Sequence, residues 1–401
     1  MMPLKRIIFV ALLLGAWQFA PAQMAGPNLG HFATNPVMVK NKPAPPSNPK
    51  VNRRTRELYA SLQSLPQKGI LFGHQDDLAY GIGWKYLPGE SDVKRVAGDY
   101  PAVYGWDLGH LELGSTHNID QVPFDTMRRF IRDGYRRGGI VTLSWHLHNP
   151  STGGSSWDTA ASVRQVLPGG DKHALYLSWL GRVADFLGSV RHKGKPVPVL
   201  FRPYHEHTGS WFWWGEKNCT SEEYIALWRM TADYLRVTRK MNNILLVYSA
   251  AEFTDEAHFL ERYPGDEYVD VLGFDTYMRD PAQEGSAGIF IERLRKSLDM
   301  LSRIAARHGK PFCLAETGLE QIPHSDWWTN TLWTAIKDYP LVYVLLWRNG
   351  RPDHYYVPYP GHPSEEDFRR FAREERLLFE SDARAADIYR TRNFWGRMLR
   401  R

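Results

Sequence analysis

The chain has 401 residues, of which 43% are hydrophobic and 23% are charged, with a formal net charge of +6 at pH 7. These values are ordinary for a soluble globular protein, and the scattered Lys and Arg residues argue against nucleic acid as a partner. Two cysteines cannot build a disulfide scaffold, although a single bond between Cys219 and Cys313 stays open.

The N-terminus has the pattern of an export signal. Lys5 and Arg6 precede an apolar run over residues 7–16, and Ala20 and Ala22 supply small residues at the cleavage spacing. Residues 1–22 are therefore a predicted Sec signal peptide, which implies a periplasmic or secreted protein. The apolar run is too short to predict a transmembrane anchor. Residues 23–50 are rich in Pro, Asn and Lys without periodicity, so we expect an extended segment outside the fold.

Regular structure is predicted to start near Arg53, where Leu58, Leu62 and Leu65 indicate a short helix. From there, short apolar runs alternate with amphipathic stretches such as residues 176–190 and 222–241. The predicted strands are residues 69–75, 102–108, 140–146, 197–204, 244–249, 269–275, 312–316 and 341–347. Eight strands with helical crossovers predict a (β/α)8 TIM barrel, a single α/β domain over residues 51–401. An open doubly wound sheet is the alternative, but no glycine-rich phosphate loop follows the first strand.

Polar side chains gather where the apolar runs stop. They are His74, Gln75, Asp107, His146, His148, His205, Glu206, Glu252, Asp275, Tyr277, Glu316, Trp347, Arg348 and Asn349. The carboxyl ends of barrel strands face the active site, so this pattern predicts one site at that end of the barrel. Long loops over residues 151–171 and 351–363 follow the third and eighth strands and are expected on the same rim.

Two of these residues are carboxylic acids on strands that face each other. Glu206 ends the fourth predicted strand and Glu316 ends the seventh. A lone glutamate at a strand end is more often a structural ion pair, but two across a barrel mouth favour chemistry. Hydrolysis of a glycosidic bond with retention needs two carboxyl groups about 5–5.5 Å apart, one protonated and one ionised.

Aromatic residues follow the first of these acids. Residues 211–214 read Trp-Phe-Trp-Trp, close after Glu206. We expect Trp211 to stack on a sugar ring and at least one of the others to pack beneath the rim. The tyrosines at 355, 356 and 359 either shape the cleft or pack on neighbouring loops.

Several of these segments resemble one family of carbohydrate-active enzymes. Residues 202–206 running into 211–215 resemble the acid/base region of glycoside hydrolase family 26, and residues 314–318 resemble its nucleophile strand. Residues 273–277, Trp145-His146 with Asn149-Pro150, and residues 347–349 are similar to further family segments. The resemblance spans roughly residues 69–350.

The resemblance implies a retaining endo-β-1,4-mannanase whose catalytic domain is the barrel, with no metal and no other cofactor. It makes Glu206 the acid/base and Glu316 the nucleophile held by Tyr277. His205 lies near the reacting sugar and Trp211 under the leaving group, while His146, Trp347 and Arg348 line the sugar-binding cleft. Expected substrates are mannan, galactomannan, glucomannan and manno-oligosaccharides, and a monomer is expected. Family alternatives are exo-acting mannobiose release, β-1,3-xylanase and mixed-linkage glucanase activity.

Two hypotheses of other classes stay open. The alternating histidines at 146 and 148, and at 205 and 207, have the spacing of a metal-dependent barrel hydrolase. Against this, no suitable lysine or further histidine set follows, and the His-Glu-x-x-His pattern is absent. A non-catalytic glycan-binding protein of the same fold is the second hypothesis. The presence of both glutamates favours an enzyme.

Overall fold

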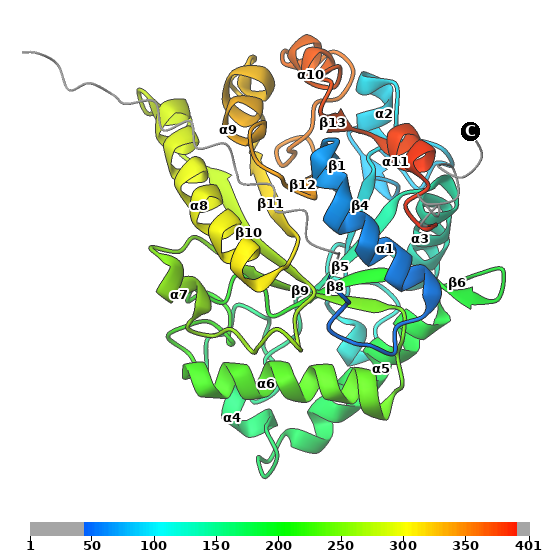
Figure 1. Ribbon diagram of the computed structural model, residues 1–401, viewed down its shortest axis with the longest axis vertical. Helices are drawn as coiled ribbons and strands as arrows, with labels where there is room; N and C mark the ends of the chain where they lie inside the picture. Colours follow the sequence, from blue (N-terminus) through cyan, green and yellow to red (C-terminus); the bar gives the residue numbers. More distant parts are fainter. Residues whose placement is uncertain (1–43, 391–401) are drawn as a thin grey trace, which may run out of the picture. The chain divides into compact units, whose positions relative to one another are not determined.

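The structure is a computed structural model that describes residues 44–390 (Figure 1). The predicted signal peptide and residues 23–43 of the segment that follows it lie outside the described residues. Eight parallel strands form a closed barrel in the order β12-β11-β10-β9-β8-β5-β4-β1, and β12 pairs with β1 to complete it. Closure excludes the open doubly wound sheet, and the predicted (β/α)8 barrel is confirmed.

Each barrel strand overlaps one of the eight predicted apolar runs, with ends that differ by up to three residues. The strands are β1 (Ile70–Gln75), β4 (Val103–Asp107), β5 (Ile140–Trp145), β8 (Val199–Pro203), β9 (Ile244–Ala250), β10 (Val271–Met278), β11 (Phe312–Leu319) and β12 (Tyr343–Leu346). Almost every residue in them is buried, because helices cover the outer face and side chains fill the interior.

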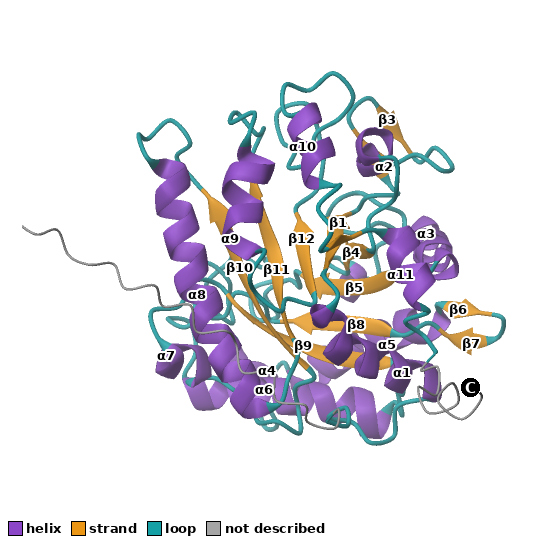
Figure 2. Cartoon of the chain, turned by 45° about the horizontal axis from the view of Figure 1, so that its top comes forward, coloured by secondary structure: helices purple, strands orange, loops and turns teal. Residues whose placement is uncertain are grey.

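Helices surround the barrel, and short strands decorate its loops (Figure 2). The helices are α1 (Arg53–Ser64), α2 (Asp92–Ala97), α3 (Phe124–Arg137), α4 (Val163–Val166), α5 (His173–Ser189), α6 (Ser221–Asp233), α7 (Glu256–Leu260), α8 (Ser286–His308), α9 (Thr334–Ile336), α10 (Glu365–Phe371) and α11 (Glu380–Ala386). Two 3-10 turns, η1 (Leu65–Gln67) and η2 (Leu111–Leu113), and two π-helical segments, η3 (Tyr234–Thr238) and η4 (Trp327–Trp333), complete the helical structure of the described residues. The remaining strands are β2 (Tyr80–Gly81), β3 (Trp84–Lys85), β6 (Arg191–His192), β7 (Lys195–Pro196) and β13 (Leu377–Leu378). Among the described residues, no helix combines the length and the apolar character needed to cross a bilayer.

Helix α1 closes the end of the barrel at which the strands begin. Its buried residues Leu58, Tyr59 and Leu62 belong to one apolar cluster with residues inside the strands. The helix starts at Asn52, whose side chain accepts a hydrogen bond from the backbone N–H of Thr55. Since this end is plugged, the carboxyl ends of the strands are the open face.

Residues 44–50 pack on the barrel. The backbone N–H and the hydroxyl of Ser47 both donate to Asp270 Oδ1 at 2.7 Å, and Asn48 is buried. The prediction that the Pro-rich segment lies outside the fold is therefore wrong for residues 44–50.

Two asparagines anchor the long loops of the open rim. Asn149 donates to the carbonyls of Asp158 and Ala160 and accepts from the N–H of Ser151. Asn349 donates to the Val357 carbonyl and accepts from the N–H groups of Tyr356 and Val357. Each loop is thus tied to the strand that precedes it by one buried amide.

Candidate active site

Glu316 lies in the second half of β11 and is almost completely buried, with 4% of its surface exposed. Its Oε2 accepts a hydrogen bond from the Tyr277 hydroxyl at 2.8 Å, and its Oε1 accepts one from Arg202 Nη2. Tyr277 stands at the end of the neighbouring strand β10. Both carboxylate oxygens are therefore held in place by hydrogen-bond donors.

Arg202 links two carboxylates inside the barrel. It comes from β8, where a charged residue interrupts an otherwise apolar strand, and its Nη1 donates to Asp275 Oδ2 at 2.7 Å. Burial alone would lower the pKa of Arg202, but Asp275 and Glu316 raise it above its ordinary value. The guanidinium stays charged and compensates the buried Glu316.

Glu206 has a different environment. It follows β8 in the left-handed backbone region, with φ of 54°, and its N–H donates to the Ser249 carbonyl at 2.9 Å. Its Oε2 accepts one hydrogen bond, from the indole N–H of Trp211 at 2.6 Å. Burial, and then the negative charge of Glu316, raise the pKa of Glu206 to about 7. One acid is thus poised to hold a proton near neutral pH.

The two glutamates face each other across the barrel mouth. One carboxylate oxygen from each of Glu206, Asp275 and Glu316 lies within 4.8 Å of the other two. Asp275 is occupied by Arg202 and by the Ser249 hydroxyl, which donates to its Oδ1 at 3.0 Å. The two remaining acids differ in their hydrogen-bond donors, because Glu316 accepts from Arg202 and Tyr277 whereas Glu206 accepts from Trp211.

A histidine pair adjoins the acids. Nδ1 of His146 lies 2.7 Å from Asp107 Oδ2, and its Nε2 lies 3.1 Å from Nε2 of His205. Although burial opposes it, the Asp107 carboxylate raises the pKa of His146, whereas burial and then Arg202 lower the pKa of His205. A charged His146 can thus donate to a neutral His205, which fixes the orientation of both rings.

Of the aromatic residues after Glu206, one is exposed and three are buried. Trp211 is 41% exposed, while Phe212, Trp213 and Trp214 lie beneath the rim. The Trp211 ring lies against the backbone at Gly209, where an added Cβ would be 2.3 Å from the ring. Glycine at 209 therefore allows the indole to reach Glu206.

Trp347 and Arg348, two further predicted site residues, directly follow β12. Trp347 and Tyr277 line a hollow of about 650 Å³, together with Tyr356. Arg348 Nε lies 3.1 Å from Asp120 Oδ1, and its Nη1 is 3.4 Å from the Tyr80 hydroxyl. In the tyrosine-rich loop, Tyr356 contacts Tyr277 edge-on at 5.8 Å, whereas Tyr355 packs against Tyr359 and His362.

The alternating histidines do not assemble into a metal-binding group. His148 turns to Glu112, at 3.0 Å, and His207 is buried between Tyr224 and Tyr248. Within residues 44–390, the group of three potential metal ligands is the acid cluster of Glu206, Asp275 and Glu316, which contains no histidine. Two of its acids already accept hydrogen bonds from Arg202.

Trp157 is a neighbour of the site that sequence reasoning missed. It is 50% exposed in the loop after β5, and its ring stacks on His146 with centroids 5.3 Å apart. Nothing in the local sequence distinguishes it from a surface residue. The charge of Arg202 within an apolar strand, in contrast, was a usable signal that this side chain points into the barrel.

Comparison with known proteins places the chain among carbohydrate-active enzymes. The model of glycosyl hydrolase family 26 matches residues 47–314, ending two residues before Glu316. A mannan endo-1,4-beta-mannosidase of Bifidobacterium adolescentis is 32% identical over 84% of the chain, and one of Bacillus subtilis strain 168 is 28% identical over 76%. The chain spans 35% of the Bifidobacterium protein and 82% of the Bacillus protein.

Solved structures show the same likeness. A β-mannanase of Bacteroides ovatus is 49% identical, with a TM-score of 0.82 over 85% of this chain and 98% of that one. An endo-β-1,4-mannanase of Cellulomonas fimi is 32% identical, with a TM-score of 0.79 over 87% of this chain and 80% of that one.

Proposed function

Because the chain belongs to glycoside hydrolase family 26, we propose that it is a retaining endo-β-1,4-mannanase with Glu206 as acid/base and Glu316 as nucleophile. The observation that carries this proposal is the short distance between the two acids, whose oxygens lie within 4.8 Å. Retaining enzymes need about 5–5.5 Å between carboxyl groups, whereas inverting enzymes leave room for a water at about 6.5–9.5 Å.

In the first step, an ionised Glu316 oxygen attacks the anomeric carbon as the glycosidic bond breaks. Protonated Glu206 gives its proton to the departing oxygen, and a covalent glycosyl-enzyme forms on Glu316. The raised pKa of Glu206, about 7, keeps this acid protonated at mildly acidic pH. The hydrogen bonds from Arg202 and Tyr277 hold the attacking carboxylate.

In the second step, ionised Glu206 removes a proton from water, and the oxygen of that water attacks the same carbon. The bond to Glu316 breaks and its carboxylate is restored, so two inversions give net retention. Trp211, beside Glu206, is an exposed ring suited to stack on a sugar of the leaving group, and Trp157, beside His146, is a second exposed ring that can contact the substrate.

Mannan is the substrate that the relatives' names support, since the Bifidobacterium, Bacillus and Cellulomonas proteins carry mannanase names. Time-resolved NMR on mannopentaose tests the mechanism, and we expect the β-anomer as the first product. An α-anomer appearing first overturns retention. Product profiling tests the mode of action: a spread of lengths from mannan supports endo cleavage, whereas mannobiose alone would replace it with exo action.

The pH dependence of kcat/KM should be bell-shaped. Activity is expected to fall above about pH 7, because Glu206 loses the proton that the leaving group needs. It should fall again in acid, because attack on the anomeric carbon needs an ionised carboxylate. Initial rates on a soluble mannan from pH 3 to pH 10 measure both limbs. A constant rate between pH 4 and pH 9 would contradict the assignment.

Replacing Trp211 with Phe should move the basic limb to higher pH. The indole N–H donates to Glu206 and lowers the pKa of that group, so its loss makes the proton harder to remove. The ring of Phe keeps most of the stacking surface. Trp157→Phe is the matched control, since no hydrogen bond joins the Trp157 indole to Glu206 among the described contacts, and its limb should stay in place.

Export is part of the same proposal. A signal peptide over residues 1–22, with its basic start and apolar run, would deliver the enzyme to the periplasm or the medium. N-terminal sequencing of protein recovered from either compartment is expected to begin near residue 23. Protein recovered there with Met1 intact would contradict cleavage.

A further inference from the structure

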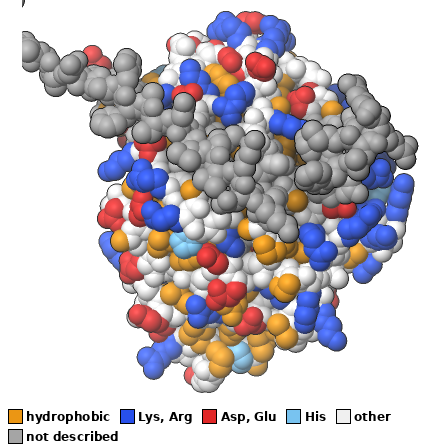
Figure 3. Space-filling view, in the orientation of Figure 1, with side chains coloured by type: hydrophobic (Ala, Val, Ile, Leu, Met, Phe, Trp, Pro, Cys, Tyr) orange, Lys and Arg blue, Asp and Glu red, His pale blue; other side chains and the backbone are white. Residues whose placement is uncertain are grey.

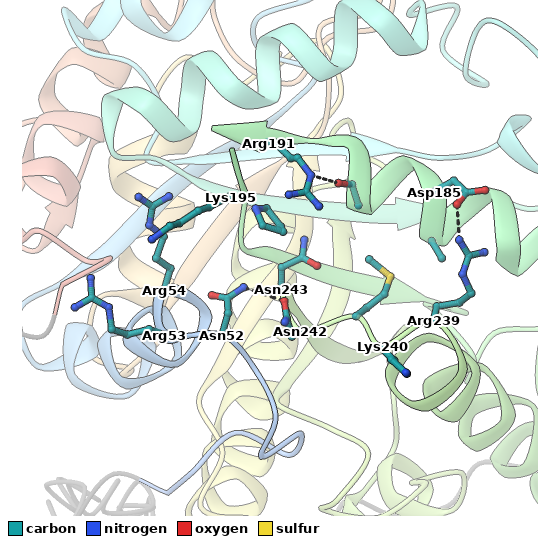
Figure 4. Close-up of a pocket in the computed structure, with 14 residues that line it drawn as sticks. Asn52, Arg53, Arg54, Asp185, Arg191, Lys195, Arg239, Lys240, Asn242 and Asn243 are labelled. Carbon is teal, nitrogen blue, oxygen red and sulfur yellow. Dashed lines mark hydrogen bonds and ion pairs between the residues drawn. The ribbon is translucent and has the colours of Figure 1, made fainter. Parts of the chain in front are cut away.

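Two adjoining hollows open at the end of the barrel where the strands begin, opposite the acid pair. The first, of about 680 Å³, lies between the start of α1, the end of α5, the β6–β7 hairpin and the loop before β9. Figure 4 shows Arg53 and Arg54 at one end of it, Arg239 and Lys240 at the other, and Asn243 between them. The second hollow shares Arg53 and Arg54 with the first and extends to α11.

The lining of both hollows is strongly basic. It contains eleven Lys and Arg residues and two Asp residues, and we call this surface the basic face. The basic residues are Arg53, Arg54, Arg136, Arg137, Arg191, Lys193, Lys195, Arg239, Lys240, Arg384 and Arg390. Their excess over the acids is nine charges, which is larger than the +6 of the whole chain. The remaining residues of the chain are therefore net acidic.

Most of these cations are not neutralised locally. Four have a carboxylate within 4.0 Å, namely Arg53, Arg136, Arg137 and Arg239. The other seven form no ion pair with a described residue, and six of the seven are exposed. Lys and Arg side chains (blue) gather along the right-hand side of Figure 3, where Figure 1 places β6.

His192 lies among the positive charges of the basic face. It belongs to β6 and lines the second hollow. Its pKa is lowered by burial and by the charges of Lys193, Arg54 and Arg136. A surface that holds like charges together in this way has a standing attraction for anions.

The chemistry of the lining favours phosphate groups over an acidic sugar polymer. Sugar sites need exposed aromatic rings, but here Tyr135 is buried and the Tyr389 ring packs edge-on against it, with centroids 4.7 Å apart. Eight of the eleven basic residues are arginines and three are lysines, and both types suit phosphates, Arg through paired hydrogen bonds and Lys as a point charge. The basic residues extend across two hollows, so they match an array of charges better than one small anion.

We propose that the basic face docks the protein on an anionic lipid bilayer, with phosphate headgroups entering the two hollows. Docked in this way, the protein presents the mouth of the barrel away from the bilayer. Each basic residue near such a surface strengthens binding by about fivefold. Binding is therefore reversible and sensitive to salt, as expected of contacts screened within about 8 Å at physiological ionic strength.

The test is co-sedimentation of the full chain with vesicles of phosphatidylcholine containing 30% phosphatidylglycerol. The test variant combines Lys193→Glu, Lys195→Glu and Lys240→Glu, three exposed lysines without ion pairs among the described residues. The matched control combines Lys85→Glu, Lys296→Glu and Lys337→Glu, three exposed lysines outside the basic face. Both variants have the same total charge and the same N-terminus, and unfolding temperatures establish that both fold.

The wild-type and control proteins should bind these vesicles and dissociate from them at 0.5 M NaCl. Neither protein should bind vesicles of pure phosphatidylcholine. The test variant should bind at least about a hundredfold more weakly. Dihexanoyl phosphatidylglycerol added to the wild-type protein should raise the pKa of His192, which NMR measures. Failure of the wild-type protein to bind, or equal loss in both variants, overturns the proposal. Binding to heparin without binding to the vesicles also overturns it, in favour of an acidic polymer.

Discussion

Glu316→Ala is expected to lower kcat on mannan by about 10⁴-fold or more, because no other group in the site can form the glycosyl-enzyme. Asp275 is close, but its two carboxylate oxygens accept hydrogen bonds from Arg202 and Ser249. Binding should survive, since the exposed rings of Trp211 and Trp157 are untouched. Calorimetry with mannopentaose measures binding, and reducing-sugar release measures turnover.

Azide separates loss of the nucleophile from general damage at Glu316. Azide can take the place of the missing carboxylate and attack the anomeric carbon once, which yields an α-mannosyl azide. Glu292→Ala is the matched control, because Glu292 is an exposed acid on the outer helix α8 and does not line the hollow at Tyr277 and Trp347. It should keep full turnover. Near-normal activity in Glu316→Ala would rule out this residue as nucleophile.

Glu206→Gln should lower kcat on mannan by about 10²–10⁴-fold, the range found for general acid–base groups. A dinitrophenyl β-mannobioside has a leaving group that needs no proton, so its first step should remain fast. The second step still needs a base, and a burst of dinitrophenol followed by slow turnover is therefore expected. Added azide should react with the accumulated glycosyl-enzyme to give a β-mannosyl azide.

The same variant tests the raised pKa of Glu206 through stability. In the folded protein this pKa is about 7, above the ordinary value of 4.5, so folding favours the protonated form. The wild-type protein therefore loses stability from this group as the pH rises from about 4.5 to 7. The unfolding temperature of Glu206→Gln minus that of the wild-type protein should therefore be more positive at pH 8 than at pH 4.

The fold was predictable because its signals are local. Each barrel strand is a short apolar run, and both faces of it are buried, so even the order of strands could be taken from the sequence. The position of the acids followed in turn, because Glu206 and Glu316 stand where such runs end. These two steps need no knowledge of side-chain contacts.

Contacts between segments that lie far apart in the sequence could not be predicted from these local patterns. The role of Arg202 depends on the register of β8 against β9 and on the turn that redirects the chain before Glu206. Trp157 reaches His146 only because Asn149 folds the loop back. The basic face is assembled from residues that lie far apart along the chain, and in the sequence the same charges are merely scattered.

The two asparagine anchors have a consequence for how such enzymes diversify. Asn149 and Asn349 hold their loops through backbone groups, so the residues between the anchored points can change in identity and number without new side-chain partners. Each loop is therefore an exchangeable segment, or cassette, whose ends are fixed to an unchanged barrel. Exchanging these cassettes between relatives is a route to altered product length that leaves the bond-breaking groups in place.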